Sequence, residues 1–154
     1  MRNPIEDRLA AMGETLPDAP APAANYVPYV QSGKLLFVSG QIAKEGDTLH
    51  IGTLGRDMDV AGGQRAARVC ALNLLAQVRA ACDGDLMRLK RVVRLGGFVN
   101  CTSDFTDHPA VINGASDFFG DVLGDAGRHA RAAVGCPSLP FGVAVEIDGV
   151  FELS

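Results

Sequence analysis

Two stretches of the chain repeat apolar residues with the period of an α-helix. One runs from about Asp59 to Cys82 and the other from Val111 to Leu123. Steps of three and four residues place the apolar side chains on one side of a helix, so both stretches predict helices that bury one face. The repeating positions are Ala67, Cys70, Ala71, Leu74, Val78 and Ala81 in the first stretch, and Val111, Ile112, Ala115, Phe118, Phe119 and Val122 in the second.

A third, shorter helix is predicted near the N-terminus. Asn3 can cap this helix, and Pro4 suits its first position. Its apolar stripe consists of Ile5, Leu9 and Met12. The proline- and alanine-rich residues 17–24 that follow should run extended as a linker.

Strands are predicted where β-branched and aromatic residues gather between turn residues. Tyr26–Val30 and Leu35–Ser39 flank a Gln-Ser-Gly turn, which is typical of a hairpin. A further strand is expected near Thr48–Gly52, and a long central strand over Leu89–Cys101. The pair Gly96-Gly97 inside the long strand indicates a bulge or a close approach of the backbone.

The stretch from His129 to Val150 predicts two more short strands. In the second of them, Val143, Val145 and Ile147 alternate with small or charged residues. This period of two is typical of a strand with one buried face. A proline-bearing segment separates the two strands, so we expect them to form a hairpin.

That hairpin would bring two opposite charges together. With a turn near residues 138–139, Arg131 and Glu146 are about equally far from the turn, and residues opposite each other share a face. The small side chain of Ala133 would leave space around them. Two interpretations stay open at this point. The pair is either an exposed ion pair, which contributes little stability, or a site that acts on a ligand.

The order of these elements favours an α+β fold in one domain, residues 1–154, with residues 1–24 as N-terminal helix and linker. The order is helix, three strands, helix, strand, helix and two strands. It predicts a mixed sheet with two helices packed on one face. The other face would then be uncovered in one copy of the chain, so we expect oligomerisation.

Composition narrows the classes of partner. The net charge is −4, from 14 Lys and Arg against 18 Asp and Glu. An acidic chain without basic runs matches nucleic acid and anionic membranes poorly. The four cysteines and three histidines lack metal-binding spacing, so we expect no metal site. No apolar run has the length of a membrane span and the first residues do not form a signal peptide, which favours a cytoplasmic location.

Several short motifs follow one another in a characteristic order after about Asn25. They are Pro28-Tyr29-Val30-Gln31, Val38-Ser39-Gly40-Gln41-Ile42, Gln64, Ala71-Leu72-Asn73-Leu74-Leu75, Asn113 ahead of Phe118-Phe119, Ala130-Arg131-Ala132-Ala133-Val134, Leu139-Pro140 and Val145-Glu146-Ile147. Together they resemble the Rid family, the reactive intermediate deaminases, which are also called YjgF-type or L-PSP endoribonuclease-like proteins.

The resemblance implies a fold, an assembly and an activity. The fold would be chorismate-mutase-like, and three copies would form a homotrimer with clefts between subunits. Members of the family hydrolyse 2-imino or 2-enamino acids to 2-oxo acids and ammonia without a cofactor. By this resemblance Arg131 binds the substrate carboxylate and Glu146 orients the attacking water. The remaining residues expected to line the cleft are Tyr29, Ser39, Gly40, Asn113 and Ala133.

Two positions depart from the pattern of the shorter deaminases. Val27 replaces a glycine before the Pro-Tyr pair, and Ala133 replaces a cysteine two residues after the arginine. With the added N-terminal helix and the loop at Ser103–Pro109, these departures resemble a longer branch of the family. His108 in that loop is interpreted as a helix-capping or surface residue.

Three functions are therefore considered. The first is hydrolysis of small imino or enamino acids. The second is a trimeric module that binds small carboxylates without turnover. The third is ribonuclease activity, which the negative net charge and the lack of a histidine pair disfavour.

Overall fold

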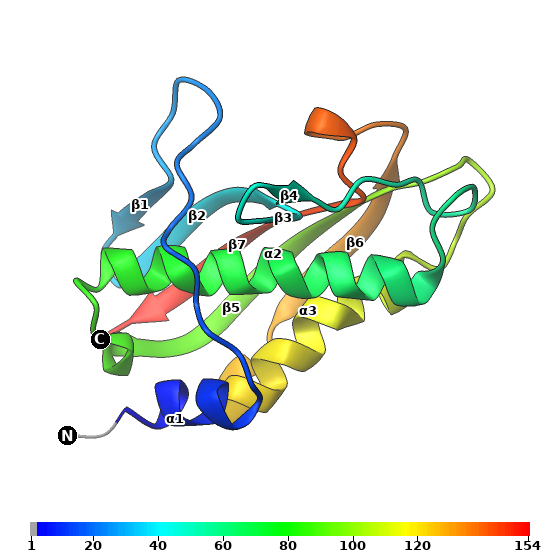
Figure 1. The fold of residues 1–154 in the computed structure, drawn as a ribbon. Helices are drawn as coiled ribbons and strands as arrows, with labels where there is room; N and C mark the ends of the chain where they lie inside the picture. The colour runs from blue at the N-terminus through cyan, green and yellow to red at the C-terminus, as the bar shows by residue number, and fades with distance from the viewer. Residues whose placement is uncertain (1–2) are drawn as a thin grey trace.

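The computed structural model describes residues 3–154 and contains a five-stranded mixed sheet with two long helices on one face (Figure 1). The strands of this sheet are β1 (Tyr29–Ser32), β2 (Leu35–Ile42), β5 (Leu89–Asn100), β6 (Ala130–Cys136) and β7 (Val145–Leu153). The helices are α1 (Pro4–Ala11), α2 (Val60–Ala81) and α3 (His108–Leu123), and β3 (Lys44–Glu45) pairs with β4 (Thr48–Leu49) in a separate small sheet. The predicted α+β class, with two covering helices and a short N-terminal helix, is confirmed.

Capping side chains set the starts of two helices. Asn3 Oδ1 accepts a hydrogen bond from the Ile5 amide at 3.0 Å, and Asp59 Oδ1 accepts one from the amide three residues further on at 2.7 Å. Such caps satisfy amides that have no partner inside the helix. The predictions for α1 and α2 are confirmed, whereas α3 begins at His108, about one turn earlier than predicted. Asp107 occupies the N-cap position of α3 without a capping hydrogen bond from its side chain.

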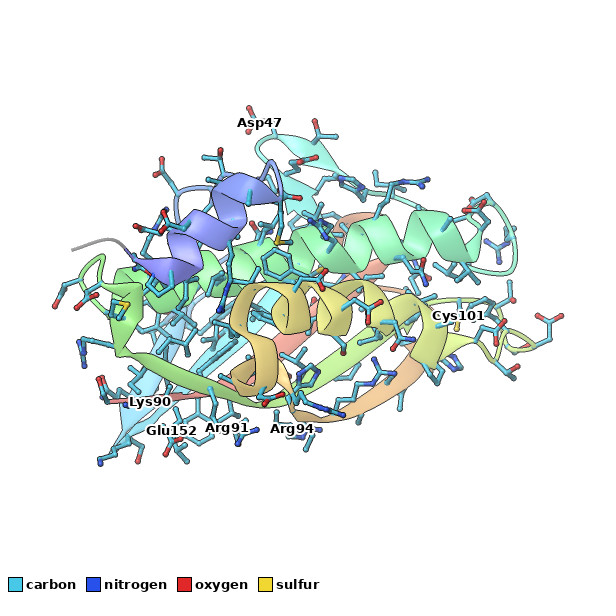
Figure 2. All side chains as sticks on the ribbon, turned by 90° about the horizontal axis from the view of Figure 1, so that it is seen from below. Asp47, Lys90, Arg91, Arg94, Cys101 and Glu152 are labelled. Carbon is cyan, nitrogen blue, oxygen red and sulfur yellow. The ribbon has the colours of Figure 1, made fainter. Side chains whose placement is uncertain are left out.

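The sheet face that carries α2 and α3 contains the hydrophobic core. The fully buried apolar side chains of β7 are Val145, Ile147, Phe151 and Leu153. They alternate with half-buried residues, because successive side chains of a strand point to opposite faces. The opposite face carries no helix within residues 3–154 and exposes Val30, Phe37 and Val134. Figure 2 shows Lys90, Arg91, Arg94 and Glu152 on that side of the sheet, away from the helices.

The predicted hairpin of the last two strands is wrong. The strand order is β1-β2-β7-β5-β6, so β5 lies between β6 and β7, and β6 runs parallel to β5. The residues after the turn make other backbone bonds: Ala144 N donates to His50 O at 2.9 Å, and Asn100 N donates to Ala144 O at 2.8 Å. Alternation along a strand predicts which residues share a face, but it does not predict which strand lies beside it.

The predicted hairpin near the start of the sheet is confirmed with shifted bounds. Strands β1 and β2 are antiparallel neighbours, and Tyr29 pairs with Val38. Strand β1 begins at Tyr29, later than the predicted Tyr26. The strand expected near Thr48–Gly52 is the short β4, which pairs with β3 outside the main sheet.

The two glycines of β5 allow close contacts on both faces of the sheet. A Cβ atom at Gly97 would lie 2.7 Å from Ile112 of α3, and one at Gly96 would lie 2.5 Å from Asp148 Oδ1. Both distances are shorter than a real Cβ atom tolerates, which favours glycine at each position. The predicted close approach is confirmed, whereas the irregular pairing of β5 with β7 falls in the first half of the strand.

The segment between α1 and β1 crosses the outer side of α2 (Figure 1). Gln77 Nε2 donates to Pro20 O at 2.7 Å, and Arg79 Nη2 donates to Pro17 O at 2.9 Å. Glu14 accepts a hydrogen bond from Arg68 Nε at 2.9 Å. The predicted linker is therefore bonded to α2 along part of its length.

Candidate functional site

Arg131 is positioned by the edge strand β6 and directed toward α3. In the parallel pairing its partner on β5 is Leu95, which is buried on the helix-covered face. The Arg131 guanidinium donates two hydrogen bonds: Nη1 to Ser116 Oγ at 3.1 Å and Nη2 to Pro109 O at 3.1 Å. The side chain is therefore held at two points by α3 of the same chain.

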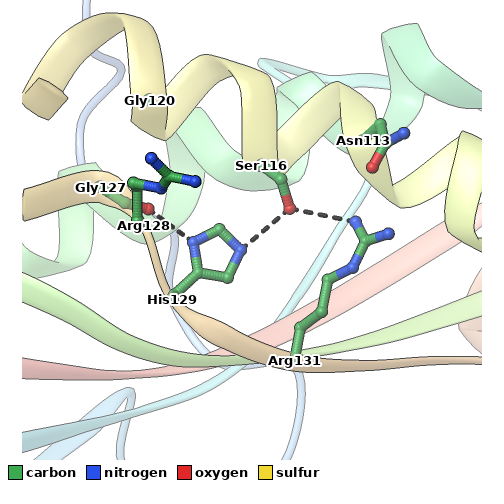
Figure 3. A pocket seen from close by; sticks show the side chains of 7 residues that line it. All are labelled: Asn113, Ser116, Gly120, Gly127, Arg128, His129 and Arg131. Carbon is green, nitrogen blue, oxygen red and sulfur yellow. Dashed lines mark hydrogen bonds between the residues drawn. The ribbon is translucent and has the colours of Figure 1, made fainter. Parts of the chain in front are cut away.

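Arg131 borders a hollow of about 280 Å³ between β6 and α3, which we call the arginine pocket. Figure 3 shows the residues that line it, which are Asn113, Ser116, Gly120, Gly127, Arg128, His129 and Arg131. Two of the predicted site residues, Asn113 and Arg131, thus meet in one place. Ala133 lies two residues after Arg131 on the same side of β6 and packs against the core, outside the lining of the pocket.

Ser116 and His129 of this pocket were not predicted. Ser116 Oγ lies 2.9 Å from His129 Nε2, and His129 Nδ1 lies 2.6 Å from Gly127 O. Two signals in the sequence point to them. His129 and Arg131 are two residues apart in an extended segment and therefore share a face. Asn113 and Ser116 are three residues apart on a predicted helix and therefore lie on one side of it.

Glu146 lies on the opposite face of the sheet. It pairs with Ile42 of β2 and with Phe98 of β5, and it is half-buried. A Cβ atom at Gly40 would lie 2.5 Å from Glu146 Oε2, so a glycine there leaves room for the carboxylate. Burial raises the pKa of Glu146 above its ordinary value, and the nearby charge of Asp148 raises it further.

Ser39 and Gly40 lie close to Glu146, at an irregularity in β2. The pairing of β2 with β7 shifts register between Val38 and Gln41, which displaces both residues from the regular ladder. Ser39 Oγ donates to Val27 O at 2.8 Å, so its hydroxyl is already bonded within the chain. Both residues also line a second, shallow hollow of about 440 Å³ on the open face, together with Val30, Phe37, Val38, Arg94, Asp148, Gly149 and Val150.

Tyr29 lies far from Arg131 in the strand order. It belongs to β1, at the edge of the sheet opposite β6. Its side chain is half-buried and packs against the hydrophobic core. One copy of the chain therefore does not bring Tyr29 to the arginine pocket.

Arg131 and Glu146 do not lie side by side, contrary to the expected hairpin. Their partners on β5 are Leu95 and Phe98, an odd number of positions apart, so the two charged side chains leave the sheet on opposite faces. Apart from Tyr29, the predicted site residues divide into two groups. The arginine group is Arg131, Asn113 and Ala133, and the glutamate group is Glu146, Ser39 and Gly40.

His108 lies outside both hollows. Its Nε2 atom is 3.4 Å from Cys101 Sγ, and its ring meets Phe105 edge to face. All four cysteines are free. Within the described part of the chain, no group of three or more His, Cys, Asp or Glu side chains is arranged to hold a metal ion. None of the helices in residues 3–154 is long and apolar enough to span a membrane.

Comparison with known proteins connects this chain to one family. The model of the family described as "YjgF/chorismate mutase-like, putative endoribonuclease" matches residues 6–151. Protein TCP17 of Trypanosoma cruzi is 52% identical over 153 residues, which covers 97% of this chain and 94% of TCP17. The crystal structure of the protein Atu1372 from Agrobacterium tumefaciens is 53% identical with a TM-score of 0.92, covering 98% of this chain and 93% of that one.

Other solved structures share the same fold. A crystal structure from Shewanella oneidensis is 38% identical with a TM-score of 0.93, and the match covers 98% of this chain and all of that chain (100%). The structure of Escherichia coli TdcF with bound serine is more distant, at 26% identity and a TM-score of 0.63, covering 92% of this chain and 97% of TdcF. These matches agree with the chorismate-mutase-like fold that the family resemblance implies.

Proposed function

Because the chain belongs to the YjgF/chorismate mutase-like family, the Rid family, whose members include deaminases, we propose that it hydrolyses small 2-imino or 2-enamino acids. The products would be 2-oxo acids and ammonia. The observation that carries the proposal is the fixed guanidinium of Arg131 at the border of a hollow. The serine bound to TdcF gives further support, since serine carries the carboxylate and the nitrogen of such substrates.

Arg131 has the bonding capacity to hold a carboxylate. A guanidinium carries five N–H groups, and two of them bond to Ser116 and Pro109, which leaves three. A carboxylate can take two of these in parallel, which fixes its plane as well as its position. A lysine at this position would supply charge without that geometry.

Glu146 suits the role of orienting and deprotonating water. An imine carbon is electrophilic once its nitrogen is protonated, so catalysis requires mainly that substrate and water are held in place. Water adds to this carbon and gives its proton to the Glu146 carboxylate. In the resulting carbinolamine, the amino nitrogen takes up this proton from Glu146. The carbon–nitrogen bond then breaks as the hydroxyl oxygen forms the carbonyl bond, the hydroxyl proton passes to solvent, and ammonia leaves. A carboxylate with a raised pKa accepts the proton more readily than an ordinary surface carboxylate.

The two groups can meet only if two copies of the chain contribute. Tyr29 lies on edge strand β1 and Arg131 on edge strand β6, so a contact between them joins different surfaces of neighbouring copies. Contacts between two different surfaces close into a ring where the rotation between neighbouring copies closes. The family resemblance implies a ring of three copies. We therefore infer a homotrimer in which each cleft combines the arginine group of one copy with the glutamate group and Tyr29 of the next. The helix-free face with exposed Phe37 and Val134 supports this arrangement.

The direct test follows the loss of 2-iminobutyrate and 2-iminopropionate generated in solution. Wild-type protein should accelerate the loss, whereas Arg131→Ala and Arg131→Lys should lower kcat/KM by about 100-fold or more. Arg65→Ala, which removes the same charge from an exposed position on α2, is the matched control. If the wild type performs no better than Arg131→Ala with any imino acid, the proposal is wrong.

A calorimetric titration with 2-oxobutyrate distinguishes the alternative function. Binding that depends on Arg131, without turnover of any imino acid, would identify the protein as a module that binds small carboxylates. Absence of both binding and turnover would contradict both functions.

A further inference from the structure

Four groups around the arginine pocket form an unbroken series of hydrogen bonds (Figure 3). Arg131 Nη1 is 3.1 Å from Ser116 Oγ, which is 2.9 Å from His129 Nε2. His129 Nδ1 is in turn 2.6 Å from Gly127 O. The series joins α3 to the start of β6 and ends at the guanidinium.

Chemistry assigns one direction to this series. The Gly127 carbonyl can only accept, so His129 Nδ1 carries the hydrogen. In the neutral ring Nε2 then accepts, and the Ser116 hydroxyl donates to it. The lone pairs of Ser116 Oγ remain available to accept from Arg131, which can only donate. Each hydrogen bond of the series therefore has one donor and one acceptor, and the direction of each bond sets the direction of the next.

The neutral form of His129 agrees with its surroundings. Burial lowers the pKa of His129 and the charge of Arg131 lowers it as well, while the bond to Gly127 O opposes both effects. The ordinary value of 6.5 is lowered, so the ring is mainly neutral near pH 7. Its Nε2 atom is then an acceptor near pH 7.

The far end of the series is fixed by packing. Gly127 is buried, and a Cβ atom there would overlap the backbone carbonyl of Phe119, so a larger residue does not fit. The ring of Phe119 also meets the ring of His129 edge to face, with centroids 6.4 Å apart. The Gly127 carbonyl and the Phe119 ring thus fix the position of His129, so that the Ser116 hydroxyl bonds to an ordered ring.

We propose that Ser116 and His129 are positioning residues that orient Arg131 for a bidentate bond to the substrate carboxylate. This inference rests on the proposed function, because it assigns the carboxylate to Arg131. Ser116 and Pro109 each accept one N–H of the guanidinium, so that two of the three remaining N–H groups can face the ligand in one plane. The carboxylate is bonded alike in the ground state and the transition state, so the loss of either residue affects KM rather than kcat.

Two pairs of variants separate positioning from general stability. Ser116→Ala removes the hydroxyl and Ser116→Thr retains it. His129→Asn retains a donor near Nδ1 but lacks the acceptor at Nε2, whereas His129→Gln places an amide oxygen near Nε2. We expect Ser116→Ala and His129→Asn to raise KM for the imino acid and Kd for 2-oxobutyrate by about tenfold, with kcat changed less than about twofold. Ser116→Thr and His129→Gln should stay within about threefold of the wild type.

A ligand-free measurement keeps the test independent of activity. The Nε–H group of Arg131 should give an ordered signal in ¹⁵N relaxation spectra of the wild type, and this order should fall in Ser116→Ala and return in Ser116→Thr. Unchanged KM, Kd and Arg131 order in a folded Ser116→Ala protein would overturn the inference. Wild-type protein with an ordered Arg131 but neither binding nor turnover would contradict the proposed function and leave the positioning of Arg131 supported.

Discussion

The arginine group and the glutamate group differ in how the chain supports them. Arg131 lies on the helix-covered face, where Ser116 and Pro109 accept its hydrogen bonds. Glu146 lies on the helix-free face, half-buried beside Asp148, and its carboxylate receives no hydrogen bond from residues 3–154. One group is therefore organised within a single copy of the chain, whereas the other places a carboxylate in surroundings that oppose its charge.

This difference has a physical consequence for each group. The hydrogen bonds that Arg131 donates to α3 fix the direction of the guanidinium before any ligand arrives, which lowers the entropy lost on binding. A partly desolvated carboxylate beside another carboxylate has a raised pKa and gains more from a new donor than an exposed carboxylate does. The arginine group is suited to binding, and the glutamate group is suited to proton transfer.

The largest expected effect comes from mixing two inactive variants. Arg131→Ala and Glu146→Gln should each lose most activity when they are expressed alone. In the proposed trimer each cleft takes one group from each of two neighbouring copies, so a trimer that contains both variants has both intact groups in about a third of its clefts. Co-expressed chains with different tags, purified as hetero-oligomers, should therefore regain about a third of the wild-type rate of imine loss. If the mixture stays as inactive as its components, the two groups do not meet across subunits.

The two faces of the sheet should respond differently to the loss of a phenylalanine. Phe151 is fully buried under the helices, so Phe151→Ala should cost about 3–5 kcal/mol of unfolding free energy. Phe37 is 46% exposed on the other face, so Phe37→Ala should cost about 1 kcal/mol or less in the single chain. Urea unfolding followed by circular dichroism measures both values. If both variants lose the same unfolding free energy at low protein concentration, the assignment of the hydrophobic core to one face of the sheet is wrong.

The pH dependence of activity should report the surroundings of Glu146. In the proposed reaction, the Glu146 carboxylate must be ionised to accept a proton from water. Burial and Asp148 raise its pKa above the ordinary 4.5, so the acid limb of kcat/KM should lie above that pH. Asp148→Asn removes a neighbouring negative charge, which lowers the pKa of Glu146 and moves the limb to lower pH. Asp117→Asn, on the exposed side of α3, is the control and should leave the limb in place. A limb that stays fixed or moves to higher pH in Asp148→Asn would exclude Glu146 as the base.

The smallest effect is expected from the ion pair on the helix-free face. Arg94 Nη1 lies 3.8 Å from Asp148 Oδ1, and the two side chains are 48% and 43% exposed. Solvent screens a pair of this kind, so Arg94→Ala should change the unfolding free energy by about 1 kcal/mol or less. Thermal unfolding at two salt concentrations tests this prediction. If Arg94→Ala loses as much unfolding free energy as Phe151→Ala, the helix-free face is covered in solution.

Local periodicity predicted the elements of this fold because each element buries one side of itself. The three- and four-residue steps around Leu74 and Phe118 identified α2 and α3, and the alternation through Val145 and Ile147 identified β7. Local periodicity did not predict which strands lie next to each other in the sheet. The alternating residues of β7 fit beside β6 or β5 equally well, and the choice depends on contacts between residues distant in sequence.

The candidate site shows the same division. The motifs identified residues of the candidate site, but the expected hairpin wrongly placed Arg131 and Glu146 on one face of the sheet. Strand β5 lies between their strands, and no local pattern in the sequence indicates this insertion. The pairing of Ser116 with His129 was missed for a similar reason. It joins α3 to β6, so it appears only when helix and strand are packed together.

The position of β7 has a consequence for the way the protein folds during its synthesis. β7 follows all other strands in the chain, yet it lies between β2 and β5 and pairs with both. Until β7 has left the ribosome, β2 and β5 each present an unpaired edge, and the sheet consists of two separate parts. Pairings of this kind between distant segments form slowly. Pulse-labelled hydrogen exchange should therefore show β2, β5 and β7 gaining protection in one step, and earlier protection of β2 alone would contradict this order.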